Sequence, residues 1–265
     1  MKKSPRNFRR SKAKPDRAAA SRHQVSSQDD RRRPRFSLEV PVLYEDEAVV
    51  VVDKPAGLLA VPIKGSDTPS AKSLLVAELK LKKQRPFVVH RIDRFVSGIL
   101  LFAKTRVDRE ELVRQFLDHT PVRQYLAVVR GRVAPETGTL VHYFQRGGMF
   151  QQLRSSRDPG ATRAELRYTV EDLFADTSLV RVELVTGLQN QIRAQFSAMG
   201  HPVIGDRKYH PDESSEQLIA RVALHAVHLE FVHPRSGEKV LIDCKPPADF
   251  RHLVQRLSHS GRMRR

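Results

Sequence analysis

A charged loop that leads directly into an apolar strand, over residues 90–104, constrains this chain more than any other feature. The loop holds Asp93 between Arg91 and Arg94, and the strand that follows begins at Gly98. A carboxylate beside a protein core is costly unless cations or hydrogen-bond donors stabilise it. The two arginines favour the ionised form of Asp93, which is then available as a nucleophile. A surface ion pair at a strand entrance would explain the spacing equally well.

The composition describes a globular protein without an obvious membrane or export segment. Its 265 residues are 40% apolar, which is enough for one large domain or two small ones with a substantial core. No apolar run approaches the ~20 residues that span a bilayer, and the polar start is unlike a secretory signal. The single cysteine, Cys244, excludes an intramolecular disulfide and a cysteine-based zinc site and favours a packed thiol. We therefore expect a protein of the reducing cytoplasm.

The formal charge of +17 is concentrated at the two ends of the chain. Residues 1–36 contain 13 Lys or Arg against 3 Asp, and residues 251–265 contain 5 Arg and no acid, so residues 37–250 are nearly neutral. Residues 1–36 lack apolar periodicity, and we expect a disordered basic tail. Two basic ends would attract a phosphate backbone without reading its bases. A tail that serves only solubility is the alternative.

Hydrophobic patterning predicts an α+β fold with a largely antiparallel sheet and flanking helices, because many strands alternate with few helices. Strands are expected at residues 42–44, 48–52, 88–92, 99–104, 124–129, 163–174, 178–186 and 222–232. Helices are expected at residues 68–82, 106–118, 190–199 and 249–257. Residues 53–57 should form a turn, and residues 144–160 a mobile insertion.

Three helices carry more specific expectations. The first should bury Leu74, Leu75 and Leu79, and the second Leu112, Val113, Phe116 and Leu117. The third should use the Asn190 side chain as its N-cap and end at Gly200.

Motifs for other chemistries are missing from the sequence. It has no Gly-rich phosphate loop, no His-Glu-x-x-His and no Gly-x-Ser-x-Gly. His225 and His228 are three residues apart on an expected strand, which places their side chains on opposite faces. We therefore expect no metal site. An Asp/His hydrolase would need a metal or a water-activating base that the sequence does not offer.

Residues 90–104 resemble the His-Arg-Leu-Asp-Arg-x-Thr-Ser-Gly-Leu-Leu signature of RluA-type RNA pseudouridine synthases, with Val96 where the family usually has threonine. Four further segments match in the same order and together cover about residues 42–250. They are residues 44–59, with Asp53-Lys54-Pro55-Ala56-Gly57; residues 123–131, with Arg123-Gln124-Tyr125; residues 187–206, with Gln191-Ile192-Arg193; and residues 224–234.

This resemblance implies a pseudouridine-synthase fold with a central cleft and an enzyme that isomerises uridine in rRNA or tRNA. It implies three catalytic residues, namely Asp93, Tyr125 and Arg193, and substrate contacts by Arg91, His90, Arg94 and Ile192. Phe95 would contact RNA or a neighbouring loop. No cofactor or metal and no obligate protein partner is expected, and the family favours a monomer. A non-catalytic RNA-binding protein that keeps the fold is the alternative.

The sequence departs from the family at one place beside the expected site. The usual Gly-Arg-Thr-His-Gln-Ile-Arg is Gly187-Leu188-Gln189-Asn190-Gln191-Ile192-Arg193 here. One positive charge and two polar groups are lost, while Arg193 is kept. We expect this change to affect the choice of RNA more than the chemistry.

Overall fold

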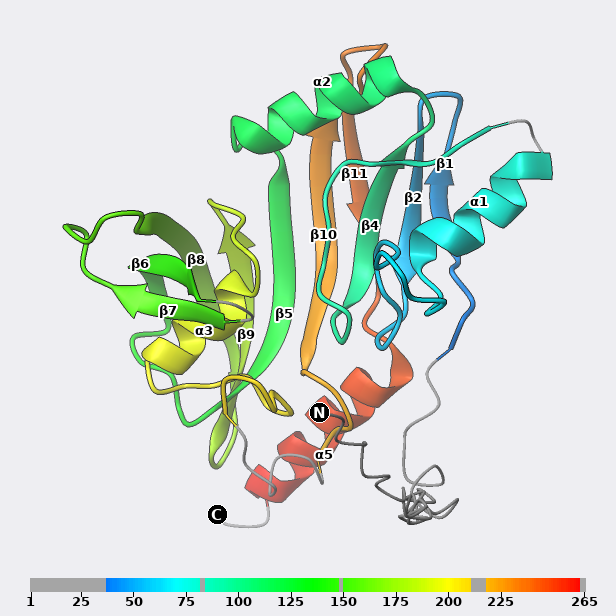
Figure 1. The fold of residues 1–265 in the computed structure, drawn as a ribbon. Coiled ribbons are helices and arrows are strands. Elements are labelled where there is room, and N and C mark those ends of the chain that lie inside the picture. Colours follow the sequence, from blue (N-terminus) through cyan, green and yellow to red (C-terminus); the bar gives the residue numbers. More distant parts are fainter. Residues whose placement is uncertain (1–36, 82–83, 148–149, 211–217, 263–265) are drawn as a thin grey trace, which may run out of the picture. The chain divides into compact units, whose positions relative to one another are not determined.

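The computed structural model describes residues 37–81, 84–147, 150–210 and 218–262. Its described strands form one 11-stranded sheet in the order β1-β2-β4-β10-β5-β9-β8-β6-β7, with β3 paired to β4 and β11 to β10 (Figure 1). The strands are β1 Val42–Glu45, β2 Val49–Lys54, β3 Phe87–Val88, β4 Ser97–Ala103, β5 Val122–Arg130, β6 Thr137–Gly147, β7 Phe150–Arg154, β8 Thr162–Leu173, β9 Thr177–Leu184, β10 Leu224–Val232 and β11 Lys239–Asp243. The helices are α1 Ala71–Leu81, α2 Arg106–Leu117, α3 Gln191–Ala198 and α5 Ala248–Arg262.

The expected α+β class with a largely antiparallel sheet is confirmed. Among the paired strands of the described chain, β4 and β10 are the parallel pair, and they place β10 between β4 and β5. The backbones approach closely at Gly98, where an added Cβ would lie 2.2 Å from the carbonyl oxygen of Ala226. Gly98 also has φ +107°, which L residues with a side chain rarely adopt. A glycine is therefore required at the start of the strand that follows the Asp93 loop.

The core lies on both faces of the central strands. Val50 and Val52 point to one face, where Leu75 and Leu79 of α1 cover them, as expected. Val49 and Val51 point to the other face and join the larger core beneath α2 and α5. Burial on both faces explains why β2 is a continuous valine run. Each such fully buried side chain contributes about 1.5–3 kcal/mol.

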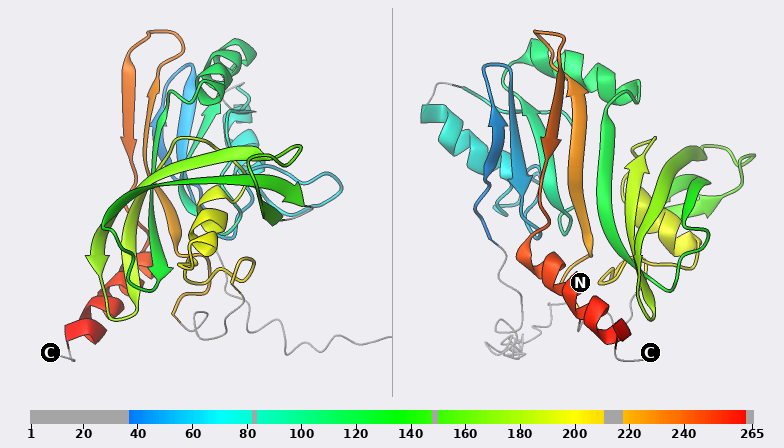
Figure 2. Two further views of the ribbon diagram at one scale, coloured as in Figure 1. Left: turned by 90° about the vertical axis from the view of Figure 1, so that its left-hand side faces the viewer. Right: turned by 180° about the vertical axis from the view of Figure 1, so that it is seen from behind.

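Figure 2 shows β6, β7 and β8 extending away from the central strands β5 and β10. The expected mobile insertion at residues 144–160 is wrong, because most of its described residues lie in β6 and β7, which pair as a hairpin. Both strands are largely exposed or half-buried and carry many polar residues, so their sequence resembles a loop. Beyond this hairpin, α3 lies against the β6–β8 region.

Two further expectations are wrong in detail. The expected strand over residues 88–92 is wrong, because β3 ends at Val88. The loop that follows it contacts the turn after β2, where the Gly57 N–H donates to the Arg94 carbonyl oxygen. Leu117 is 72% exposed, because the inner side of α2 is formed by Leu112 and Gln115. Gln115 can be buried there because both ends of its amide are hydrogen-bonded: Nε2 donates to the Val232 carbonyl oxygen, and Oε1 accepts the Val232 N–H.

The expected basic tail at residues 1–36 lies outside the described residues, as do residues 263–265. The expected C-terminal helix is confirmed as α5, which continues five residues beyond the predicted end. In the part of the chain that the structure describes, no helix has the length and apolar content of a membrane span.

Candidate active site

The loop that carries Asp93 is held from below by the turn that follows β2. Lys54, a fully buried residue, donates from Nζ to the carbonyl oxygens of Pro55 (2.8 Å), Leu58 (2.9 Å) and Arg94 (3.1 Å). The Gly57 N–H also donates to the Arg94 carbonyl at 2.8 Å. Burial, followed by the charge of Arg221, lowers the pKa of Lys54 to about 7. The Lys-Pro-Ala-Gly turn thus fixes the backbone beside Asp93.

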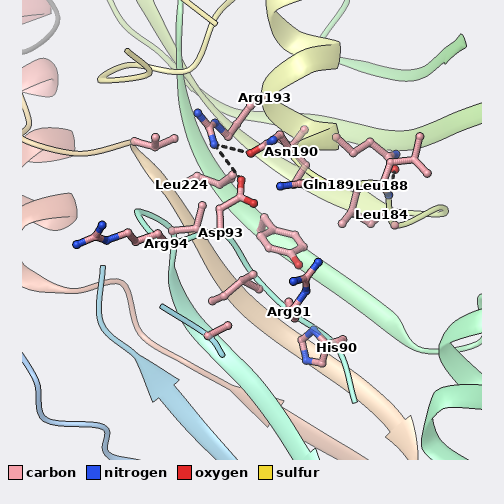
Figure 3. A pocket seen from close by; sticks show the side chains of 18 of the residues that line it. His90, Arg91, Asp93, Arg94, Leu184, Leu188, Gln189, Asn190, Arg193 and Leu224 are labelled. Atoms are coloured by element: carbon pink, nitrogen blue, oxygen red, sulfur yellow. Dashed lines mark hydrogen bonds and ion pairs between the residues drawn. The ribbon is translucent and has the colours of Figure 1, made fainter. Parts of the chain in front are cut away.

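The structure brings Asp93 and Arg193 together, although they are 100 residues apart in sequence. Arg193 Nη1 donates to Asp93 Oδ2 at 3.0 Å, and the Asp93 side chain keeps 23% of its surface exposed (Figure 3). The other edge of the guanidinium donates from Nε and Nη2 to the two oxygens of Asp206, each at 2.7 Å. Such a two-point ion pair fixes an arginine firmly. Asp93 therefore faces an anchored cation.

The buried surroundings of Arg193 favour its charged form. Burial alone would lower its pKa, but the hydrogen bonds and charge of Asp206, with that of Asp93, raise the pKa above its ordinary value. Asp206 is itself fully buried and accepts backbone N–H bonds from Lys208 (3.0 Å) and Tyr209 (3.1 Å). The Tyr209 ring lies beneath the guanidinium, 5.4 Å from ring centroid to Cζ.

Asn190 precedes α3, as expected, but it does not cap the helix with its side chain. Its backbone is left-handed, with φ 56°, and its Oδ1 accepts a hydrogen bond from Arg193 Nη1 at 2.7 Å. The side chain that bonds the backbone before α3 is that of Gln191, whose Oε1 accepts the Leu188 N–H at 2.9 Å. The departure from the family pattern therefore contacts the guanidinium that holds Asp93, and its effect on the choice of RNA stays a prediction.

Tyr125 lies in the middle of β5 and lines the same cavity as Asp93. Its strand is paired on both sides, with Val182 of β9 and Ala226 of β10 opposite it, so the ring has a rigid base. Burial raises the pKa of the phenol, the charge of Arg123 opposes this rise, and Asp93 adds to it.

The four residues expected to contact substrate lie in different environments. His90 Nε2 accepts the Leu101 N–H at 3.2 Å, and its ring stacks on Phe116 with centroids 4.7 Å apart. Burial, with the charge of Arg123, lowers the pKa of His90 to about 3, so its ring is neutral. Ile192 is buried in the core beside Arg193.

The two arginines that flank Asp93 are both exposed. Arg94 donates from Nε to the Gly57 carbonyl at 2.8 Å and lies over the Phe95 ring. Arg91 lies on the cavity wall on the side of Asp93 away from Arg193 (Figure 3). Phe95 is 41% exposed at the end of this loop.

These groups surround a cavity of about 900 Å³ whose described lining is strongly basic. Asp93 is the one acid among those lining residues, whereas several arginines and a lysine lie around it, including Arg91, Arg123, Arg163, Arg207 and Lys208. Residues 37–250 as a whole are nearly neutral, so the cavity lining is more positive than the rest of this part of the chain. A polyanion is the ligand that this surface favours.

Sequence reasoning did not assign roles to Lys54, Arg123 and Asp206. All three lie within segments that resemble the family, which was the available signal. Among the described residues, no group of three His, Cys, Asp or Glu could hold a metal ion. His225 is bonded to Ser97 and the Cys244 carbonyl, while His228 pairs with Asp243. Cys244 is a buried thiol, as expected, and burial raises its pKa.

Comparison with known proteins agrees with this architecture. Residues 48–198 match the family model for RNA pseudouridylate synthase. The chain is 34% identical over 229 residues to an uncharacterized RNA pseudouridine synthase, YlyB, of Bacillus subtilis, covering 84% of this chain and 75% of the relative. It is 31% identical to ribosomal large subunit pseudouridine synthase D of Zymomonas mobilis, covering 85% and 75%. It is 33% identical to the dual-specificity RNA pseudouridine synthase RluA of Salmonella typhimurium, covering 79% and 93%.

A solved structure, that of human RNA pseudouridylate synthase domain containing 4, shares the fold with a TM-score of 0.69. It is 20% identical in sequence, and the similarity covers 82% of this chain and 93% of the human one. The chain belongs to the RNA pseudouridylate synthase family. It is an RNA pseudouridine synthase, an isomerase that converts uridine in RNA to pseudouridine.

Proposed function

We propose that Asp93 is the catalytic carboxylate of this synthase. The observation that carries the proposal is its position: Asp93 Oδ2 is 3.0 Å from Arg193 Nη1, and the side chain is partly exposed to the basic cavity. The reaction breaks the N1–C1′ bond of a uridine and rejoins the uracil through C5. It needs an anion beside the ribose, which Asp93 provides by adding to C1′ or by removing the C2′ proton.

Arg193 orients this carboxylate through the contact between Nη1 and Oδ2. Its bidentate pair with Asp206 anchors the guanidinium, so Nη1 stays directed at Asp93 when substrate enters. An anchored charge costs no reorganisation during the reaction. Asp206 is thus a positioning residue that acts through Arg193.

Tyr125 provides a face on which the uracil ring stacks while it is detached from the sugar. Stacking of a base on an aromatic ring contributes about 1–3 kcal/mol. The hydroxyl group of Tyr125 also assists removal of the proton from C5.

Arg91 contacts the RNA around the extruded nucleotide, since taking a uridine out of its stack costs a few kcal/mol. Its exposed position on the cavity wall supports this role. His90, Arg94 and Ile192 shape the substrate site: His90 and Arg94 hold the Asp93 loop, and Ile192 packs beneath Arg193.

The substrate is a uridine in rRNA or tRNA. Relatives named as ribosomal large subunit and dual-specificity synthases support this class. We infer a monomer that works in the cytoplasm, with residues 37–250 as the catalytic domain and the basic segments 1–36 and 251–265 gathering RNA backbone. Sedimentation of the full chain as a dimer would refute the monomer.

The experiment uses RNA labelled with tritium at uridine C5, which is released on isomerisation. Total RNA from a strain lacking the gene is incubated with intact protein, Asp93→Asn and, as a matched surface control, Asp243→Asn. Release by the intact protein and Asp243→Asn, with loss of more than about 10³-fold in Asp93→Asn, is expected. Equal release by all three would refute the role of Asp93. Mapping pseudouridine in the deletion strain then identifies the target.

A further inference from the structure

Arg123 is a buried cation in the wall of the cleft whose role the reaction described so far leaves open. It precedes Tyr125 by two residues on β5, is 7% exposed and lines the same cavity. Its Nη2 donates to the carbonyl oxygens of Leu184 (3.4 Å) and Val185 (3.2 Å), while its Nε is buried without an acceptor. No carboxylate of the described chain lies within ion-pair distance of it.

The surroundings are built to hold this guanidinium. Its Cζ lies 5.6 Å from the centroid of the Phe116 ring, which offers the negative face of its π system. A Cβ added at Gly187 would lie 2.8 Å from Arg123 Nη1, so the loop before α3 leaves room for the group. Burial lowers the pKa of Arg123. Holding a cation under these conditions opposes stability, which indicates a functional group.

We propose that Arg123 stabilises the negative charge that the uracil ring carries while it is detached from the sugar. The inference rests on the proposed function of the cleft. When the N1–C1′ bond breaks, its electron pair stays on N1 and spreads to the O2 and O4 oxygens. Asp93 meanwhile gains either a bond to C1′ or the C2′ proton. C5 then bonds to C1′, and Asp93 either releases C1′ or returns the proton to C2′. Finally, the proton on C5 leaves and N1 takes up a proton.

The neighbouring cations are less suited to this task. Arg193 is occupied by Asp206, Asp93 and Asn190. Arg91 is exposed, where water weakens its field. Arg123 is buried, and alternate residues of a strand share a face, so its side chain lies on the Tyr125 side of β5. A fixed donor in a water-poor site is worth most where charge develops during the reaction.

The experiment compares two leaving groups. A transcript that carries the mapped target is made with uridine or with 5-fluorouridine, whose ring anion is more stable. C5 of 5-fluorouridine carries fluorine where uridine carries the proton that leaves, so the rearranged product of this substrate differs from pseudouridine. The readout for both substrates is therefore single-turnover loss of the starting nucleoside, measured by chromatography after nuclease digestion for intact protein, Arg123→Met and Arg123→Lys. Arg123→Met should slow uridine conversion about 10²–10³-fold and 5-fluorouridine conversion at least tenfold less. Arg123→Lys, which keeps a cation, should show a smaller loss with the same preference.

RNA affinity, measured by filter binding, should change less than about threefold in both variants, because the charge appears only after binding. Equal losses on the two substrates, a loss of affinity alone, or full activity of Arg123→Met would overturn the proposal. If Arg123→Met does not fold, the proposal is tested by Arg123→Lys, through the ratio of its rate loss on uridine to its rate loss on 5-fluorouridine. Failure of the proposed function would give a different result from failure of the Arg123 proposal, because the intact protein would then convert neither substrate.

Discussion

Asn190 accepts a hydrogen bond from the same nitrogen of Arg193 that donates to Asp93, at 2.7 Å against 3.0 Å. The αL backbone of Asn190 directs its side chain towards that nitrogen, and Asn and His are among the residues that adopt this conformation most readily. Histidine, the family's usual residue at this position, is thus compatible with the backbone that this chain has here. This chain therefore differs from the family pattern at a residue that contacts the Arg193–Asp93 pair, which we propose to be catalytic.

Asn190→Gly should lower the single-turnover rate by about 10- to 100-fold, since a hydrogen bond to a charged group is worth about 1.5–3 kcal/mol. Glycine tolerates φ 56°, so the variant removes the amide without straining the backbone. Asn190→His should recover most of the rate through its ring nitrogen. An unchanged rate with an altered choice of RNA would support the sequence-based expectation instead.

Asp206→Asn should lower both activity and stability. It leaves the buried Arg193 with half of its anionic partners, and breaking a buried ion pair costs about 3–5 kcal/mol. Urea unfolding measures this loss, and tritium release measures the fall in activity. Asp249→Asn serves as a control, because it breaks a bidentate pair with Arg221 whose carboxylate is half exposed. The prediction is wrong if Asp206→Asn loses stability alone.

Lys54 should make stability increase with pH in the alkaline range. Its pKa is about 7 in the folded protein, against an ordinary value of 10.5, so between these values the unfolded chain binds more protons. The free energy of unfolding then rises by up to ~1.4 kcal/mol per pH unit. Below pH 7 both states are protonated and the slope disappears. Denaturant unfolding of intact protein and Lys54→Met at pH 6–10 tests this, and parallel curves would contradict it.

Gly98→Ala should destabilise the fold by more than about 2 kcal/mol, because its Cβ would meet the Ala226 carbonyl and its φ is positive. Gly200→Ala is the matched control: its φ is +83°, but nothing lies within 4 Å of the added atom. Its cost should be the backbone strain alone, ~1–2 kcal/mol. Similar melting temperatures for the two variants would show that the close approach of β4 to β10 carries no cost.

The sequence predicted most elements because their hydrophobic patterns are local. The valine run of β2 and the leucines of α1 depend on neighbours a few residues away, and both are confirmed. The sequence analysis missed the β6–β7 hairpin because these strands are held by pairing with each other and with β8. Their apolar residues do not alternate with polar ones, so the sequence carries no strand pattern. Leu117 was misplaced because a polar residue, Gln115, occupies the inner side of α2.

At the site, the resemblance identified Asp93, Tyr125 and Arg193 as a group, but not what surrounds them. Asp206 is 13 residues beyond Arg193 and bonds it only because the chain turns back after α3. The role of Asn190 depends on a positive φ, and that of Arg123 on a missing partner. Neither property is written in residue type or spacing.

The insertion of β10 between β4 and β5 has a consequence for how the enzyme forms. The loop with Asp93 and the strand with Tyr125 are neighbours only through residues 224–232, which leave the ribosome after both. Contacts across such long stretches of chain slow folding. The Asp93 loop and the Tyr125 strand are therefore held side by side only after β10, which lies in about the last sixth of the chain, has been synthesised.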